Sequence, residues 1–134
     1  MMKSEMIKIL VISASAIVLQ SCSYGAYVNE TFTPLTEAVP TCEKQPEQVE
    51  LYFDGEKTDF DYVKIGLIQI EGAINTQQAE LIERFKKLAK SKCANAIIGI
   101  KKVYKTREQG LIGIDEKPEA YTSEVFYGIA VNKS

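Results

Sequence analysis

The sequence contains no histidine and no tryptophan in 134 residues. Without histidine, the chain can carry neither a Ser-His-Asp triad nor a Cys-His pair, and it lacks the commonest zinc ligand. No two carboxylates are set apart in the sequence as an acid/base couple. These absences predict a protein that is not an enzyme, with no catalytic residues, no cofactor and no metal site.

An excess of basic charge and a long apolar run are also missing. The chain carries 16 Lys and Arg against 18 Asp and Glu, a net charge of −2. Nucleic-acid binding needs a clustered basic face, so we expect no nucleic-acid partner. The longest apolar run, residues 9–19, is interrupted by Ser13 and Ser15. It is too short to span a bilayer, which takes about 20 apolar residues.

This apolar run has the features of a secretory signal. Lys3 and Lys8 give it a basic start, although Glu5 interrupts that start. Its length fits the apolar region of a signal peptide, usually roughly 7 to 15 residues. We therefore expect residues 1–21 to be a signal peptide.

The four residues Leu19-Gln20-Ser21-Cys22 resemble the lipobox of bacterial lipoproteins, a Leu-x-(small)-Cys pattern. The resemblance implies that Cys22 carries a diacylglycerol and, after cleavage behind Ser21, becomes the acylated first residue. Two or three acyl chains would anchor the chain stably in a membrane. Ser23, a residue other than Asp after the cysteine, favours the outer membrane, with a periplasm-facing domain as the default. The alternatives are an ordinary secretory signal with an incidental cysteine, or an uncleaved apolar stretch.

Cysteine is scarce, with three residues in all. If Cys22 carries lipid, Cys42 and Cys93 remain as a pair. An exported chain meets an oxidising compartment, where disulfides form and persist. We therefore expect a disulfide between Cys42 and Cys93, with two free thiols as the alternative.

Residues 22–48 are predicted to be the lipidated cysteine and a flexible tether. Three of the four prolines of the chain fall in this segment, which has no sustained hydrophobic period. Such a composition favours extended or disordered backbone. The tether would hold the folded part away from the lipid headgroups. Its aromatic residues would lie at the membrane interface or in solvent: Tyr24, Tyr27 and Phe32.

Residues 49–134 are predicted to form one α+β domain. Alternating apolar residues predict strands over 49–53, 62–71, 97–104 and 121–131. Gly66, in the middle of the second strand, indicates a bulge or the close approach of another backbone.

A helix is predicted from Asn75 or Thr76 to about Lys90. An apolar stripe at helical spacing identifies its buried face: Leu81, Ile82, Phe85, Leu88 and Ala89. Lysines gather at its end, either as a docking patch or as a solvated helix terminus: Lys86, Lys87, Lys90 and Lys92.

The predicted order is therefore ββαββ. A right-handed crossover through the helix makes strands 62–71 and 97–104 parallel, and the last two strands can pair as an antiparallel hairpin. We expect a single small domain with a three- to four-stranded mixed sheet and one amphipathic helix packed on it.

The connection over residues 105–120 contains an apolar patch between charged residues, with Leu111, Ile112 and Ile114 at its centre. It is a candidate loop for binding a partner or touching a membrane. It could equally be a strand extension or a cover for the core.

Residues 62–66, the helix end Leu88-Ala89 and residues 94–100 resemble two sets of small bacterial domains. One is the YbjQ-like family, labelled heavy-metal binding, and the other is the group of RcsF-like envelope lipoproteins. The match covers roughly residues 60–104. Cys93 stands where YbjQ-like members usually have glycine, and RcsF-like members use paired disulfides, for which this chain has too few cysteines. The resemblance implies a lipidated periplasmic domain that binds or reports on another envelope component.

The sequence thus predicts a non-enzymatic, periplasm-facing binding or stress-sensing module, held in the outer membrane by its N-terminal lipid, with an envelope protein as partner. The alternative is a small-ligand or metal-binding domain of YbjQ-like type, whose ligands would be Cys42, Cys93 and carboxylates. A thiol enzyme acting through Cys93 is disfavoured, because a helix C-terminus raises a thiol pKa and no histidine can serve as base.

Overall fold

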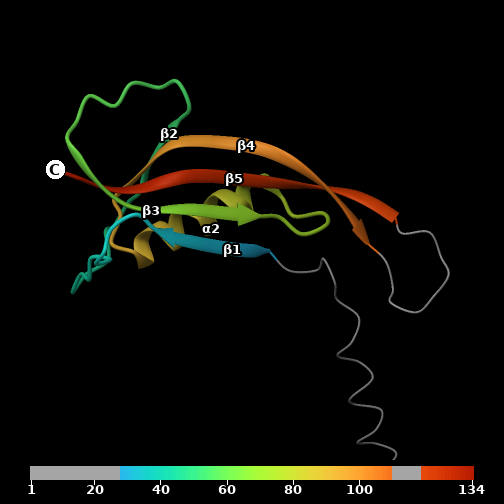
Figure 1. Cartoon of the computed structure of the whole chain (residues 1–134), viewed down its shortest axis with the longest axis horizontal. Coiled ribbons are helices and arrows are strands. Elements are labelled where there is room, and N and C mark those ends of the chain that lie inside the picture. The colour runs from blue at the N-terminus through green and yellow to red at the C-terminus, as the bar shows by residue number, and fades with distance from the viewer. Residues whose placement is uncertain (1–27, 110–118) are drawn as a thin grey trace, which may run out of the picture.

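A computed structural model describes residues 28–109 and 119–134. In these residues one helix lies on one face of a five-stranded mixed sheet (Figure 1). The elements are β1 Asn29–Pro34, β2 Glu50–Phe53, β3 Tyr62–Glu71, α2 Gln78–Ser91, β4 Ala96–Gln109 and β5 Glu119–Lys133. The α+β class is as predicted.

The strands lie in the order β1-β3-β5-β4-β2. The pairs β1–β3, β3–β5 and β5–β4 are antiparallel, whereas β2 and β4 are parallel. The predicted hairpin of the last two strands is confirmed, and β3 and β4 run in the same direction with β5 between them. The predicted strand count of three to four and the order ββαββ are wrong, because a further strand, β1, precedes the others.

Strand β1 lies inside the segment that was predicted to be a tether. It pairs with β3 from Asn29 opposite Glu71 to Pro34 opposite Gly66. Phe32 is its one large apolar side chain, and it packs against the core of the domain. A polar six-residue strand with a single half-buried apolar side chain shows no alternation, so no strand is predicted here.

The core lies between α2 and the sheet. Leu81, Phe85 and Ala89 of the predicted stripe are fully buried. On the sheet they meet buried side chains of three strands, among them Ile68, Ile70, Ile97, Ile100, Phe126 and Ala130. Burial of each large apolar side chain contributes about 1.5–3 kcal/mol. The helix lies close to β5, because a Cβ added at Gly128 would be 2.9 Å from Phe85 Cζ.

The ends of α2 differ in how well the sequence defined them. The predicted start at Asn75 or Thr76 is wrong: the helix begins at Gln78, and its N-cap residue Gln77 makes no side-chain cap hydrogen bond. At the other end Cys93 adopts φ +62°. Its N–H donates to the Lys90 carbonyl at 3.0 Å, and the Ala94 N–H donates to the Ala89 carbonyl at 3.0 Å. This pair of bonds is a Schellman motif, in which the left-handed position favours glycine.

The sheet face opposite α2 is covered at one end by the connection between β2 and β3. Phe60 of that connection lies 5.1 Å from the Tyr52 ring and 5.9 Å from the Tyr62 ring, measured between centroids. These rings cover a small second cluster of Ala96, Ile98 and Val131. The aromatic residues of β2 and β3 are therefore used to bury the second face.

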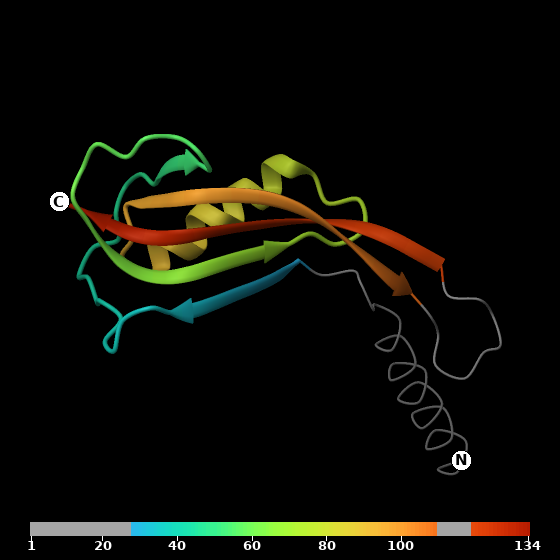
Figure 2. The same ribbon diagram turned by 45° about the horizontal axis from the view of Figure 1, so that its top comes forward.

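Strands β4 and β5 extend beyond the rest of the sheet (Figure 2). Asn29 pairs with Glu71, Glu71 with Val125, and Val125 with Val103, so these four residues form one row across the sheet. Past this row β4 and β5 stay paired as far as Gln109 and Glu119. We call this two-stranded extension, residues 104–109 and 119–124, the arm. Its strands take up both ends of the predicted 105–120 connection.

Candidate functional site

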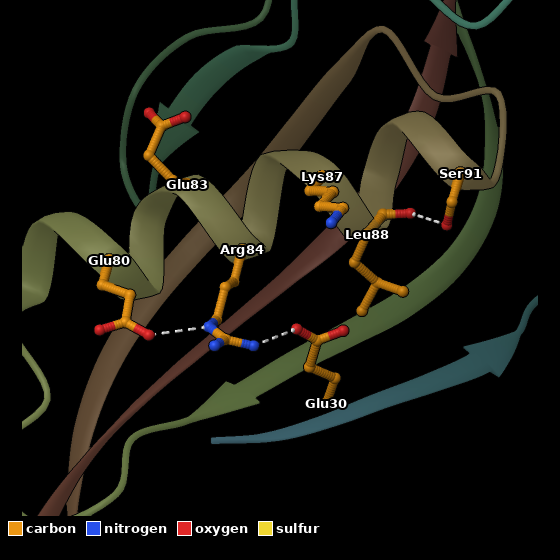
Figure 3. Close-up of a pocket in the computed structure, with 7 residues that line it drawn as sticks. All are labelled: Glu30, Glu80, Glu83, Arg84, Lys87, Leu88 and Ser91. Carbon is orange, nitrogen blue, oxygen red and sulfur yellow. Dashed lines mark hydrogen bonds and ion pairs between the residues drawn. The ribbon is translucent and has the colours of Figure 1, made fainter. Parts of the chain in front are cut away.

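An open groove of about 580 Å³ runs between α2 and the edge strand β1 (Figure 3). It is lined by Glu30 of β1 and by Glu80, Glu83, Arg84, Lys87, Leu88 and Ser91 of α2. The apolar stripe of α2 faces the sheet, so the polar side of the helix meets the sheet edge and forms the groove wall.

Arg84 ties the helix to the strand across this groove. Its Nε donates to Glu80 Oε1 at 3.0 Å, and its Nη1 lies 3.4 Å from Glu30 Oε1. The hydrogen bond to the Glu80 carboxylate, and then that to Glu30, raise the pKa of Arg84. Arg84 thus carries a permanent charge that two carboxylates neutralise.

The lysines at the helix end do not act as one patch. Lys86 pairs with Glu83 at 3.2 Å, Lys90 Nζ donates to the Glu47 carbonyl at 2.6 Å, and Lys92 lies 4.7 Å from the Phe32 ring centroid. Lys87 lies in the groove, where no acidic group of the described residues pairs with it. It is therefore the charged side chain of the groove that is left for a ligand.

The edge of β1 adds backbone groups to this groove. The Leu35 N–H donates to the Ile65 carbonyl at 3.0 Å, which fixes the alternation of the β1–β3 ladder. By that alternation Glu30 and Phe32 direct their N–H and C=O groups away from β3. Because β1 is at the end of the strand order, no strand of the described ranges pairs with those groups.

This arrangement is suited to binding. An exposed strand edge beside a groove accepts an extended peptide as an additional strand, whose alternate side chains enter the groove. The one hydroxyl in the lining, that of Ser91, donates to the Leu88 carbonyl at 2.6 Å. With the hydroxyl proton used in this way and no imidazole in the chain, the groove offers contacts to a ligand and no activated nucleophile.

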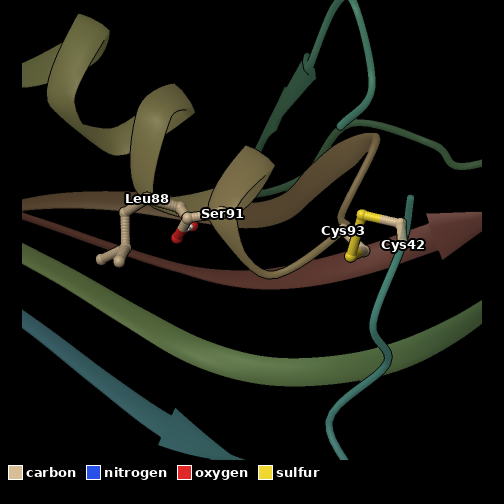
Figure 4. Close-up of a disulfide and its surroundings, with 4 residues drawn as sticks. All are labelled: Cys42, Leu88, Ser91 and Cys93. Atoms are coloured by element: carbon tan, nitrogen blue, oxygen red, sulfur yellow. Dashed lines mark hydrogen bonds between the residues drawn. A yellow bond between two sulfur atoms is a disulfide. The ribbon is translucent and has the colours of Figure 1, made fainter. Parts of the chain in front are cut away.

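The predicted disulfide is confirmed, since Cys42 and Cys93 are bridged with their Cα atoms 5.9 Å apart (Figure 4). It ties the segment between β1 and β2 to the C-terminal end of α2. No group of three or more His, Cys, Asp or Glu residues in the described ranges could hold a metal ion.

The other predicted site residues lie outside the described ranges. Cys22 precedes residue 28, and Leu111, Ile112 and Ile114 fall between residues 109 and 119. Their roles as lipidation site and partner loop stay predictions. In the part of the chain that the structure describes, no helix is long and apolar enough to cross a membrane.

A polar cluster at the base of the arm was missed by the sequence analysis. Arg107 binds Glu71 with both Nε and Nη2, the latter at 2.7 Å from Oε2, and the Ser123 hydroxyl donates to Glu71 Oε1 at 3.2 Å. The Glu71 side chain is 7% exposed, and the hydrogen bonds from Arg107 lower its pKa. The cluster joins β3, β4 and β5. A carboxylate at the end of a mostly apolar strand was its one signal in the sequence.

Comparison with known proteins gives one distant structural similarity. No family model and no curated protein matches the chain. A crystal structure of the Francisella virulence factor FvfA, in an orthorhombic form, is similar with a TM-score of 0.48 and 17% sequence identity. The match covers 78% of this chain and 97% of that chain. A similarity at this level assigns no function.

Proposed function

We propose that the protein is a lipid-anchored, periplasm-facing module of the outer membrane that binds another envelope protein without catalysis. The observation that supports this most directly is the Cys42–Cys93 disulfide. It uses two of the three cysteines, and the third, Cys22, follows the apolar run in a lipobox-like sequence. A disulfide in a small domain is typical of exported proteins, which fold in an oxidising compartment. A lipobox requires the same export.

The groove is the proposed binding site. Its ligand would be an extended segment of the partner that adds to the outer edge of β1 and receives hydrogen bonds from the Glu30 and Phe32 N–H groups. An acidic side chain of that segment would meet Lys87, and a small or apolar one would lie on Leu88. Backbone pairing would supply the affinity, and these two side-chain contacts would determine which sequences the groove prefers.

The apolar residues Leu111, Ile112 and Ile114 are a proposed second contact, with the partner or with the membrane surface. They lie in the sequence between the paired ends of β4 and β5, so the segment that contains them joins the two strands of the arm. The alternative metal-binding function would need Cys42 and Cys93 as thiolates, and the disulfide occupies both sulfur atoms.

The lipid anchor is tested by intact-mass analysis of the protein isolated from native envelopes. We expect a chain that starts at residue 22 and carries the added mass of two or three acyl chains. Cys22→Ala should abolish both the added mass and membrane retention. A chain with an unmodified residue 22, or with its leader still attached, would contradict the proposal.

The binding site is tested by placing a photoreactive side chain at Lys87 and, as a control, at the exposed Lys57 on the far side of the domain. We expect one defined crosslinked protein from position 87 in native envelopes and none from position 57.

Glu30→Pro removes an outward N–H and retains the ladder to β3, so it should suppress this crosslink, whereas Glu30→Gln should retain it. Equal crosslinking from both positions, or insensitivity to Glu30→Pro, would exclude the groove.

A further inference from the structure

We infer that the domain lies directly against the bilayer that holds its lipid, with the arm directed at the headgroups. This inference rests on the proposed acylation of Cys22. The surface that the arm would contact is that of the same bilayer. Two observations support the inference: the length of chain before β1, and the place where that chain enters the fold.

The first step is the length of the linker. Strand β1 begins at Asn29, and Val28 already packs against the core. Cys22 is seven residues before Asn29, and seven fully extended residues span at most about 25 Å. A tether over residues 22–48 would instead have reached about 90 Å. Formation of β1 therefore removes most of the expected separation between domain and membrane.

The second step is direction. Asn29 of β1 and Val103 of β4 lie in the same row of the sheet. Three strand-to-strand spacings, about 15 Å in all, separate them. The chain that leads back to Cys22 and the arm both leave the sheet at this row. From Val103 to Gln109 the arm extends about 20 Å beyond it. The first residue of β1 and the base of the arm thus lie at the same end of the sheet (Figure 2).

The third step compares these lengths with a bilayer. The headgroup layer on one side is about 5–8 Å thick, and the linker must cross it to reach the acyl chains. This leaves about 17–20 Å of the linker above the headgroups. The arm is at least as long as that remainder, so at full linker extension its end reaches the headgroup layer.

The side chains at the two ends of the molecule agree with this orientation. At the base of the arm, Tyr104 is 60% exposed with Lys102 Nζ 5.2 Å from its ring centroid, and Ile74, in the connection that follows β3, is 40% exposed. Tyrosine is enriched at membrane interfaces, where lysine extends its charge toward water. The opposite end carries a carboxylate-rich connection between β2 and β3, with Asp54, Glu56, Asp59 and Asp61.

The absence of tryptophan permits a direct test with single-tryptophan reporters. The full acylated chain carrying Tyr121→Trp, which lies opposite Arg107 toward the end of the arm, or Lys57→Trp as the distal control, is reconstituted into phosphatidylethanolamine/phosphatidylcholine vesicles that contain lipids brominated near the headgroup. We expect about twofold quenching of the Tyr121→Trp fluorescence and almost none for Lys57→Trp. Thr106→Trp, at an exposed position on the other strand of the arm, is the second reporter if Tyr121→Trp folds poorly.

Vesicle flotation in the same samples separates the two proposals. If the protein floats with the vesicles and both arm reporters are quenched no more than Lys57→Trp, the orientation is wrong and the lipid anchor stands. If the acylation-competent chain does not float, the anchor itself is wrong, and the inference falls with it.

A lengthened linker tests the cause. Insertion of about 20 Gly and Ser residues between Ser23 and Tyr24 extends the reach beyond the length of the arm. Quenching of the arm reporters should then fall to the level of Lys57→Trp while flotation is unchanged. Undiminished quenching would overturn the claim that linker length sets the orientation.

Discussion

The ring of Phe32 lies against the backbone of Gly66. A Cβ at Gly66 would lie 2.6 Å from Phe32 Cζ and 2.9 Å from the Thr33 carbonyl oxygen. The register of β3 against β5 shifts between Lys64 and Gly66, so the glycine stands at a bulge as well as under the ring. The sequence predicted a bulge or the close approach of another backbone at this position, and the structure has both the bulge and the nearby Thr33 carbonyl.

Gly66→Ala should therefore lower the free energy of unfolding by about 1–3 kcal/mol, because the added methyl group forces the ring or the β1 backbone to move. Urea denaturation measures this change. In a Phe32→Ala background the same substitution should cost less than half as much, since one of the two obstacles is gone. An equal cost in both backgrounds would show that the ring does not restrict the position.

The disulfide should contribute a large part of the stability. Its cysteines are 51 residues apart, and the chain-entropy model gives about 4 kcal/mol for such a loop. Reduction should lower the urea midpoint of the domain. The double variant Cys42→Ser/Cys93→Ser should have this lower midpoint without reductant, and adding reductant should not change it. Thiol titration of the denatured, unreduced domain should detect neither cysteine; two free thiols would refute the bridge.

A matched pair of variants separates the bridge from the backbone conformation of Cys93. In a Cys42→Ser background, Cys93→Gly should be more stable than Cys93→Ala by about 0.5–1 kcal/mol, because glycine adopts φ +62° without strain. Equal stability would mean that the end of α2 relaxes once the bridge is gone.

Stability should depend on pH through Glu71. Arg107 lowers the pKa of Glu71 in the folded state, so the ionised carboxylate stabilises the fold at every pH above its unfolded pKa of about 4.3. This contribution is lost as pH falls through the lower folded pKa. Glu71→Gln should therefore cost about 1.5–3 kcal/mol at pH 7 and progressively less below pH 4.

Urea denaturation at pH 7 and pH 3 measures this, with Glu43→Gln at an exposed position as control. A difference between Glu71→Gln and the unmodified chain that stays constant with pH would contradict the assignment.

Asn95 should be sensitive to a change of one atom. Its Nδ2 donates to the Lys133 carbonyl at 3.2 Å and its Oδ1 accepts from the Lys133 N–H at 2.7 Å, so the amide imitates a peptide group at the end of β5. Asn95→Asp replaces the donor with an oxygen that faces a carbonyl, and should cost about 1–3 kcal/mol. The same substitution at the exposed Asn132 should cost almost nothing. Comparable effects at both positions would contradict this role.

The sequence by itself determined the elements whose burial follows a local period. Strand β3 has the predicted bounds, because apolar residues occur on both of its faces. The stripe of α2 identified Leu81, Phe85 and Ala89 as buried. The cysteine count predicted the disulfide. Gly66 predicted a bulge or a close backbone contact, because a glycine inside a strand usually marks one of these.

Only the tertiary structure decided which elements meet. The place of β5 between β3 and β4, and the recruitment of β1 by one phenylalanine, depend on contacts between residues far apart in the chain. The Glu71–Arg107 pair and the groove around Lys87 arise in the same way. A local period reports which face of an element is buried, but it contains no information on the partner that buries it, because strand pairing is chosen by the packing of the whole core.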